Sequence, residues 1–313
     1  MSIRIANLRG LLALLCLFAA WAGIEGARTP AHALGVLTCT FGMTNVAFGA
    51  IDVLPGAAFS TNATLTINCS GLSILPTNVF VCVTLPPRAM TGPASSTLLY
   101  DLLGPPPLMT SWSNSTAIVV PVSGTLLSFT ANATVTIPAT LFANQQSARP
   151  GAYAQTVNAT VSYSTTTCTS GLIVGSGAFS FQASANVLKS CNVVATNLNF
   201  GTTGDLATAI AAQSEIDVQC SNGTGYIVAL NGGLSGAADP TQRKMTFGAN
   251  AITYGLYQNL GHSLPWGSTI GTNVVSGTGS SISQPIAVYG YVPAQSMPAI
   301  GTYSDTVVVS VAY

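Results

Sequence analysis

Short runs of alternating apolar and polar residues follow one another along this chain. Between Leu65 and Cys69 every second residue is apolar, and the residues between them are threonine and asparagine. A period of two is typical of a β-strand with one buried face. The same pattern predicts strands at 79–85, 117–122, 134–137 and 154–163, and again at 181–187, 216–220, 226–230, 252–257, 285–292 and 302–313. Turns rich in Gly, Pro, Asn and Ser separate these runs, so we predict an all-β protein.

The chain contains two copies of one pattern. A cysteine is followed after five residues by Asn-x-x-Phe-Gly and later by Cys-Ser, first at 39–70 and again at 191–221. The copies also end alike, because 151–163 matches 301–313 without a gap. Each copy spans roughly 125 residues, which is a usual size for one domain. We therefore predict two tandem antiparallel β-sandwiches of the immunoglobulin-like type.

The N-terminus has the pattern of an export signal. Arg4 and Arg9 precede an apolar run over 11–24, and Ala31-His32-Ala33 offers the small residues that a signal peptidase recognises. The resulting division is a signal peptide at 1–33, a first domain at 34–163, a linker at 164–179 and a second domain at 180–313. The sequence leaves open whether part of 171–178 instead supplies a closing strand to the first domain.

The cysteine count indicates disulfide bonds. The chain has seven cysteines, of which Cys16 lies in the predicted signal peptide. An even number in an exported protein predicts a disulfide framework, and no Cys-x-x-Cys spacing suggests zinc or thiol-redox chemistry. The predicted pairs are Cys39–Cys69 and Cys191–Cys220, which follow from the repeat, and Cys82–Cys168, which are the two that remain.

Charged residues are scarce, and this excludes several function classes. Between 34 and 163 they are only Asp52, Arg88, Asp101 and Arg149. A basic surface for phosphate groups is absent, so nucleic acid is not a predicted partner. The abundance of large apolar residues argues equally against a disordered chain.

No catalytic constellation can be assembled from the sequence. After the predicted cleavage one histidine remains, His262, in a Gly-His-Ser turn without an evident partner. Glu215 and Asp217 lie two residues apart on the polar face of a predicted strand, where a solvated face is the simpler interpretation. We predict no enzyme activity, no metal site and no cofactor.

A proline-stiffened apolar loop is the candidate interaction surface. It is inserted relative to the second copy, and exposed apolar patches commonly mark binding sites. The alternative is an ordinary loop that folds back over the core. The residues of this predicted adhesive loop are Leu102, Leu103, Pro105, Pro106, Pro107, Leu108 and Met109. Trp112 and Trp266 recur at matching places, so we expect them in the two cores.

The second copy contains several further motifs. They are the segment 181–191, the turn at 197–201, Cys220-Ser221, Tyr254-Gly255-Leu256-Tyr257, Pro265-Trp266-Gly267 and Gly301-Thr302-Tyr303. Together these motifs resemble the spore coat protein U domain, a family that includes subunits of archaic chaperone–usher pili. The first copy keeps part of this pattern, with Ser-Trp-Ser at 111–113 in place of Pro-Trp-Gly.

The resemblance implies a second domain that lacks its last strand. A periplasmic chaperone, and then the N-terminal strand of an adjacent pilin subunit, would complete it during assembly at an outer-membrane usher. The groove residues that the resemblance implies are Phe181, Val187, Val307, Val309, Val311 and Tyr313. Five residues remain ahead of Cys39 after the predicted cleavage, which at about 3.3 Å each are too few for a donated strand.

These observations predict a fimbrial tip subunit that is exported through the periplasm to the cell surface. Residues 34–163 would contact an abiotic or host surface in adhesion and biofilm formation, and 180–313 would act as the pilin domain. Two alternatives stay open. One is a structural coat protein with two complete sandwiches, and the other is a secreted carbohydrate-binding module that uses Tyr100 or Asn114.

Overall fold

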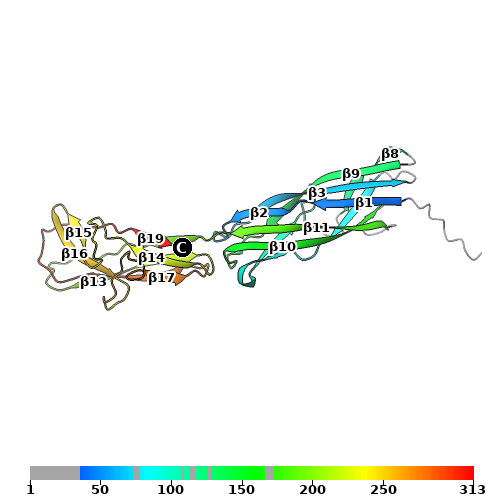
Figure 1. Cartoon of the computed structure of the whole chain (residues 1–313). Helices are drawn as coiled ribbons and strands as arrows, with labels where there is room; N and C mark the ends of the chain where they lie inside the picture. Colours follow the sequence, from blue (N-terminus) through cyan, green and yellow to red (C-terminus); the bar gives the residue numbers. More distant parts are fainter. Residues whose placement is uncertain (1–35, 73–77, 108, 113–116, 126–127, 166–172) are drawn as a thin grey trace, which may run out of the picture.

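The computed structural model describes residues 36–72, 78–107, 109–112, 117–125, 128–165 and 173–313. Nearly all regular structure in this part of the chain is β-strand, which confirms the predicted fold class. The strands form two domains that follow one another end to end (Figure 1). Within the described residues, no helix has the length and apolar character needed to cross a bilayer.

The first domain is one curled sheet around a single core. Its strand order is β1-β3-β9-β6-β5-β10-β11-β2, with β4 between β10 and β7, and β8 beside β9. The elements are β1 (Val36–Met43), β2 (Val46–Ile51), β3 (Phe59–Leu72), β4 (Asn78–Thr84), β5 (Ala89–Thr91), the 3-10 turn η1 (Pro93–Ser95), β6 (Thr97–Leu102), β7 (Ala117–Pro121), β8 (Ser123–Thr125), β9 (Ser128–Leu141), β10 (Gly151–Ser164) and β11 (Ile173–Val187). The alternation read from the sequence decides which side faces inward: Leu65, Ile67 and Cys69 of β3 are all buried.

The second domain is a smaller two-layer sandwich. One sheet has the order β12-β13-β18-β16-β15 and the other the order β17-β14-β19. The strands are β12 (Cys191–Ala195), β13 (Ile210–Cys220), β14 (Gly225–Leu230), β15 (Arg243–Phe247), β16 (Asn250–Tyr257), β17 (Val275–Thr278), β18 (Gln284–Val292) and β19 (Val309–Ala312). The fully buried Trp266 lies in the core between the two layers, and Trp112 lies in the core of the first domain.

Strand β11 packs in the first domain, although the predicted division places it in the linker and the second domain. It pairs antiparallel with β10 from Gly151–Val187 to Tyr163–Gly175 and parallel with β2. Its alternate residues Phe179, Phe181, Ala183, Ala185 and Val187 all enter the first core. The predicted linker at 164–179 and the predicted start of the second domain at 180 therefore cut through a strand, and packing divides the chain after Val187.

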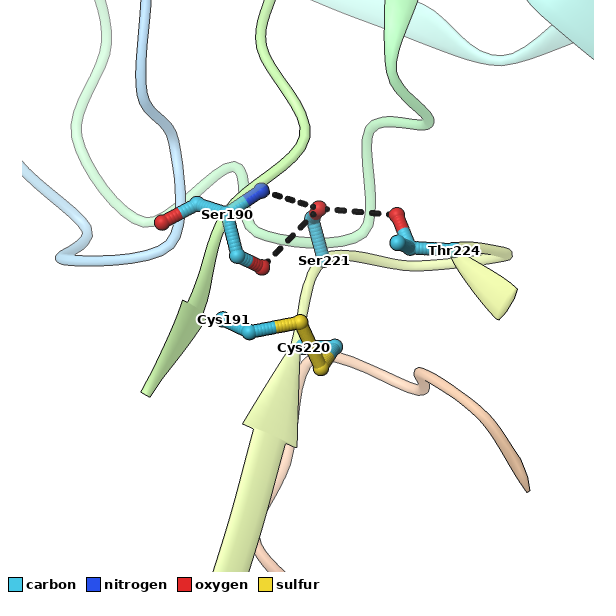
Figure 2. Close-up of a disulfide and its surroundings, with 5 residues drawn as sticks. All are labelled: Ser190, Cys191, Cys220, Ser221 and Thr224. Atoms are coloured by element: carbon cyan, nitrogen blue, oxygen red, sulfur yellow. Dashed lines mark hydrogen bonds between the residues drawn. A yellow bond between two sulfur atoms is a disulfide. The ribbon is translucent and has the colours of Figure 1, made fainter. Parts of the chain in front are cut away.

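The connection between the domains is short and held by hydrogen bonds. Only Leu188, Lys189 and Ser190 separate β11 from β12. Figure 2 shows the backbone N–H of Ser190 donating to Oγ of the buried Ser221, at 3.0 Å, beside the disulfide that joins β12 to β13. The side-chain hydroxyl of Thr224 forms a hydrogen bond with the same Ser221 hydroxyl, with 3.0 Å between the two oxygens.

Two further hydrogen bonds link loops of the two domains directly. The amide of Asn222 donates to the carbonyl oxygen of Ser147 at 2.7 Å, and the hydroxyl of Ser281 donates to that of Gln146. The 142–150 loop is anchored in turn by Gln145, whose side chain bonds both backbone groups of Leu99. The two domains are thus joined by the chain itself and by these two hydrogen bonds between loops.

The disulfides predicted from the repeat are present. Cys39–Cys69 joins β1 to β3, and Cys191–Cys220 joins β12 to β13, each between paired residues of adjacent antiparallel strands. Cys82 is also disulfide-bonded. Cys168, its predicted partner, lies outside the described residues, so that pairing stays a prediction.

Candidate functional site

The two domains end in matching segments that differ in how much of them is strand. In the first domain, β10 is a continuous strand of 14 residues that pairs with β11 along nearly its whole length. In the second domain, the matching segment 301–313 is strand only over the four residues of β19, which pairs with β14. Ahead of β19 the segment makes one isolated bridge, between Ser304 and Thr246. The predicted strand at 302–313 is therefore only partly formed.

The other neighbour of β11 shows the same difference. In the first domain β2 pairs with β11, with Ala183 opposite Val46 and Val187 opposite Ile51. The matching residues 197–201 of the second domain form no strand. Both segments that would flank a β11-like strand in the second domain therefore lack that partner, which leaves an open sheet edge.

An apolar groove lies where the second domain has no such strand. Val157, Ala159 and Val161 of β10 are at most 2% exposed. Their counterparts Val307, Val309 and Val311 are only half-buried. Two cavities of ≈ 550 Å³ and ≈ 600 Å³ open here and share part of their lining. We define the C-terminal groove by the lining residues Leu198, Phe200, Met245, Tyr303, Val307 and Val309.

A fully buried arginine supports the structure beside this groove. Arg243 begins β15, two residues before Met245, and is 0% exposed. Its guanidinium nitrogens donate to the carbonyl oxygens of Pro240 (2.7 Å), Asn231 (2.8 Å), Trp266 (2.8 Å) and Leu230 (3.2 Å). Burial lowers the pKa of Arg243, while Tyr254 and Asp305 act in the opposite direction. A buried cation is tolerated only when its donors are satisfied, and here converging carbonyl groups satisfy them.

The same cluster ties the last segment of the chain to the sheet. The hydroxyl of Tyr254 on β16 donates to Oδ2 of Asp305 at 2.6 Å. The pKa of Tyr254 is raised, mainly by burial and to a smaller extent by this hydrogen bond, so the phenol stays protonated and remains a donor. Oδ1 of Asp305 accepts the backbone N–H of Leu234 at 2.8 Å. Asp305 therefore helps to hold the segment 301–308 in place, together with the Ser304–Thr246 bridge.

The first domain contains a matching cluster. The hydroxyl of Tyr100 donates to the side-chain oxygen of Gln155 at 3.0 Å, and burial raises the pKa of Tyr100 to about 12. Phe48 packs on Tyr100, and Phe200 packs on Tyr254, each with ring centroids 6.0 Å apart and planes at 69°. The arginine differs, since Arg88 pairs with Asp101 near the surface. The two domains thus share the hydrogen-bonded tyrosine and its aromatic neighbour, but not the buried arginine.

The predicted groove residues divide between the two domains. Val307 and Val309 line the C-terminal groove, and Val311 packs against the second core. Tyr313 is 54% exposed. Phe181 and Val187 do not belong to this groove: they lie in the core of the first domain, because β11 fills the equivalent groove there. Assigning them to the C-terminal groove was wrong.

The predicted adhesive loop is only partly a surface. Leu102 is 0% exposed and pairs with Ala139 as the last residue of β6, so its assignment to the loop surface was wrong. The loop leaves the sheet near the Leu141 end of β9. The other end of β9, beside β8, is the one farthest from the second domain (Figure 1). Leu103 and Pro105 are half-buried; Pro106, Pro107 and Met109 are exposed; Leu108 lies outside the described residues.

The remaining candidate residues are Tyr100, Asn114 and His262. Tyr100 is 2% exposed, so it offers no ring on which a sugar could stack, and Asn114 lies outside the described residues. His262 lies between the rings of Tyr257 and Tyr291, with centroids 5.4 Å and 4.6 Å away. Among the described residues, no three His, Cys, Asp or Glu side chains gather in a way that could hold a metal ion.

Sequence reasoning missed Arg243 and the role of β11. A signal for the arginine existed, because Arg-x-Met recurs at 88–90 and 243–245. Arg88 immediately precedes β5 and Arg243 begins β15, and these strands pair with the strands of Tyr100 and Tyr254. The signal for β11 was seen as the alternation at 181–187 but was assigned to the wrong core.

Comparisons with known proteins agree with the duplicated fold. The family model described as Spore Coat Protein U domain matches residues 29–160 and 178–310. Protein U of Myxococcus xanthus is 33% identical over 129 residues, which cover 37% of this chain and 71% of that protein. A chain in the crystal structure of the CsuC–CsuE chaperone–tip adhesion subunit pre-assembly complex, from archaic chaperone–usher Csu pili of Acinetobacter baumannii, is similar in fold. Its TM-score is 0.51 at 18% identity, with 88% of this chain and 100% of that chain covered. Since the family model matches well over half of the sequence in two copies, this chain belongs to the Spore Coat Protein U domain family.

Proposed function

We propose that this chain is a two-domain tip subunit of a fimbria, with a structural and not a catalytic role. Its second domain accepts a strand from the adjacent pilin subunit. The observation that carries the proposal is the contrast between β10, paired along its length with β11, and the segment 301–313, which lacks that partner. Adding a strand supplies main-chain hydrogen bonds to an open edge and buries alternate side chains in the groove beneath it.

The proposed assembly route involves two further partners. A periplasmic chaperone covers the C-terminal groove first, and an outer-membrane usher then exchanges the chaperone for the pilin strand. The fold similarity to a chain of a chaperone–tip adhesion subunit pre-assembly complex supports the chaperone as a partner. The protein would pass through the periplasm and end at the tip of a fimbria on the cell surface.

A donor-peptide exchange experiment tests the strand-accepting role. We expect residues 34–313, co-expressed in a periplasm with the cognate chaperone, to purify as a 1:1 complex that releases the chaperone when a pilin N-terminal peptide is added. Peptide at 100 times its dissociation constant should stabilise the second domain by about 2.7 kcal/mol in thermal unfolding. The control is the same peptide with an aspartate at one inward position. A stable monomer made without chaperone, with no affinity for any pilin peptide, would contradict the proposal.

We further propose that the first domain adheres to surfaces through the exposed part of its inserted loop, Pro106, Pro107 and Met109. Met109→Ser should lower attachment of the protein to polystyrene roughly tenfold or more, because a buried methionine side chain contributes about 1.5–3 kcal/mol. Adsorption from solution onto coated sensors measures this. Thr110→Ser is the matched control on the same loop, and Leu102 stays unchanged because it is part of the core. Equal adsorption of both variants would rule out this surface.

A structural coat protein is the second candidate function. The observation in its favour is the 33% identity to Protein U, together with the family to which the chain belongs. This alternative needs a second domain that is stable without a donated strand. The exchange experiment therefore separates the two, since a coat protein would gain nothing from a pilin peptide.

A further inference from the structure

We propose that β11 is the internal template of the strand that the second domain accepts, in direction, register and side-chain size. This inference rests on the proposed strand-accepting function and specifies its partner. The incoming strand should run antiparallel to 301–313 and parallel to 197–201, as β11 runs relative to β10 and β2. Its inward positions should be apolar and alternate with polar outward ones.

The two flanking segments of β11 have gapless counterparts around the C-terminal groove. β10 from Gly151 to Tyr163 matches 301–313, and the Asn-x-x-Phe-Gly segment that contains the start of β2 matches 197–201. The aromatic pairs Phe48–Tyr100 and Phe200–Tyr254 beside these segments have the same geometry. A strand between the two segments in the second domain therefore meets the same arrangement that β11 meets in the first.

The register follows from the pairs that β11 makes. Phe181 is opposite Val157 and Phe179 is opposite Ala159, so the equivalent donor residues face Val307 and Val309. The N-terminal part of β11 approaches aromatic rings closely. A Cβ added to Gly175 would lie 2.3 Å from the ring of Tyr163, which matches Tyr313. We expect the donor to carry small residues where it passes Val311 and Tyr313.

Two residue differences between the domains change the size of the donor side chains that fit in the C-terminal groove. Val309 stands where the first domain has Ala159, and Leu198 stands where it has Val46. Both replacements add side-chain volume beside the inward positions equivalent to Phe179 and Ala183. Overfilling a packed interior is unfavourable. The donor should therefore carry a side chain smaller than phenylalanine opposite Val309 and one no larger than alanine opposite Leu198.

Cross-linking with a peptide of residues 173–187 tests the register in the full chain. The outward residue Ser180 is opposite Asn158, whose counterpart is the exposed Val308. Paired residues of adjacent strands have Cα atoms about 4.5–5.5 Å apart, within the range that a disulfide spans. A slip of two residues moves the partner about 6.6 Å along the strand and brings the Cα–Cα distance to roughly 8 Å, beyond that range. A Val308→Cys chain should form a disulfide with a Ser180→Cys peptide at least tenfold faster than with a Gln182→Cys peptide.

The controls keep the outcomes distinct. A chain that also carries Val307→Asp should not cross-link, and a peptide with Phe179→Val should bind more tightly than the unchanged peptide. Three results would overturn the template and leave the proposed function intact. They are faster cross-linking at the shifted position, weaker binding of the Phe179→Val peptide, and failure of the 173–187 peptide to bind when a pilin N-terminal peptide does bind. If neither peptide binds, the proposed function itself fails and takes the template with it.

Discussion

Val157→Asp should unfold the first domain, whereas the same change at the matching Val307 should leave the second domain folded and abolish strand binding. Val157 is 0% exposed on β10, where it is paired with Phe181 of β11, so its replacement by aspartate leaves an unpaired charge in a core. Such a change costs on the order of 4 kcal/mol or more, close to the whole stability of a small domain. Val307 is half-buried in an open groove, where water can solvate a carboxylate. We expect that change to cost about 0.5–1 kcal/mol.

Hydrogen exchange resolved along the chain measures this pair, because it reports on each domain separately. The controls are Thr156→Asp and Thr306→Asp, which change the exposed neighbours of the two valines and should leave both domains protected. The prediction is contradicted if Val307→Asp unfolds the second domain as completely as Val157→Asp unfolds the first. That result would mean that the C-terminal groove is closed in the isolated chain.

Arg243→Met should destabilise the second domain by about 3–5 kcal/mol, although methionine is apolar and similar in length. Four carbonyl oxygens converge on the guanidinium, and the substitution leaves them buried without a donor. The loss should also loosen the segment 301–308, since Tyr254 and Asp305 lie in the same cluster.

Denaturant unfolding of the full chain measures the effect as a lower midpoint for the second domain only. Lys244→Met is the matched control one residue further along β15, because Lys244 is exposed and its loss should change stability by less than about 0.5 kcal/mol. Arg88→Met in the first domain should cost less than Arg243→Met, since Arg88 retains some exposure and bonds Asp101 and Ser111 instead of four backbone carbonyls. A second domain as stable with methionine as with arginine would show that the carbonyl groups find other donors.

The sequence was sufficient for features that depend on local pattern. The period of two located most strands, and the repeat predicted two domains and the disulfides Cys39–Cys69 and Cys191–Cys220. These disulfides join positions only 30 and 29 residues apart on strands that pair directly, so local order is enough to bring them together. The half-formed strand at 301–313 also lies where the family resemblance implied an open edge.

The sequence by itself thus determined where most strands lie and which faces of those strands are apolar, but not that 301–313 is strand only over β19. Only the tertiary structure decided which core each face enters. An alternating strand such as β11 fits either neighbouring core, and its choice depends on pairing with β10 and β2. Leu102 is apolar beside a proline-rich loop, and only its pairing with Ala139 makes it a core residue. Arg243 is charged, and arginine is rarely fully buried unless its donors are paired. Its burial depends on carbonyl groups of Asn231, Leu230 and Trp266, which the fold brings together from other parts of the chain.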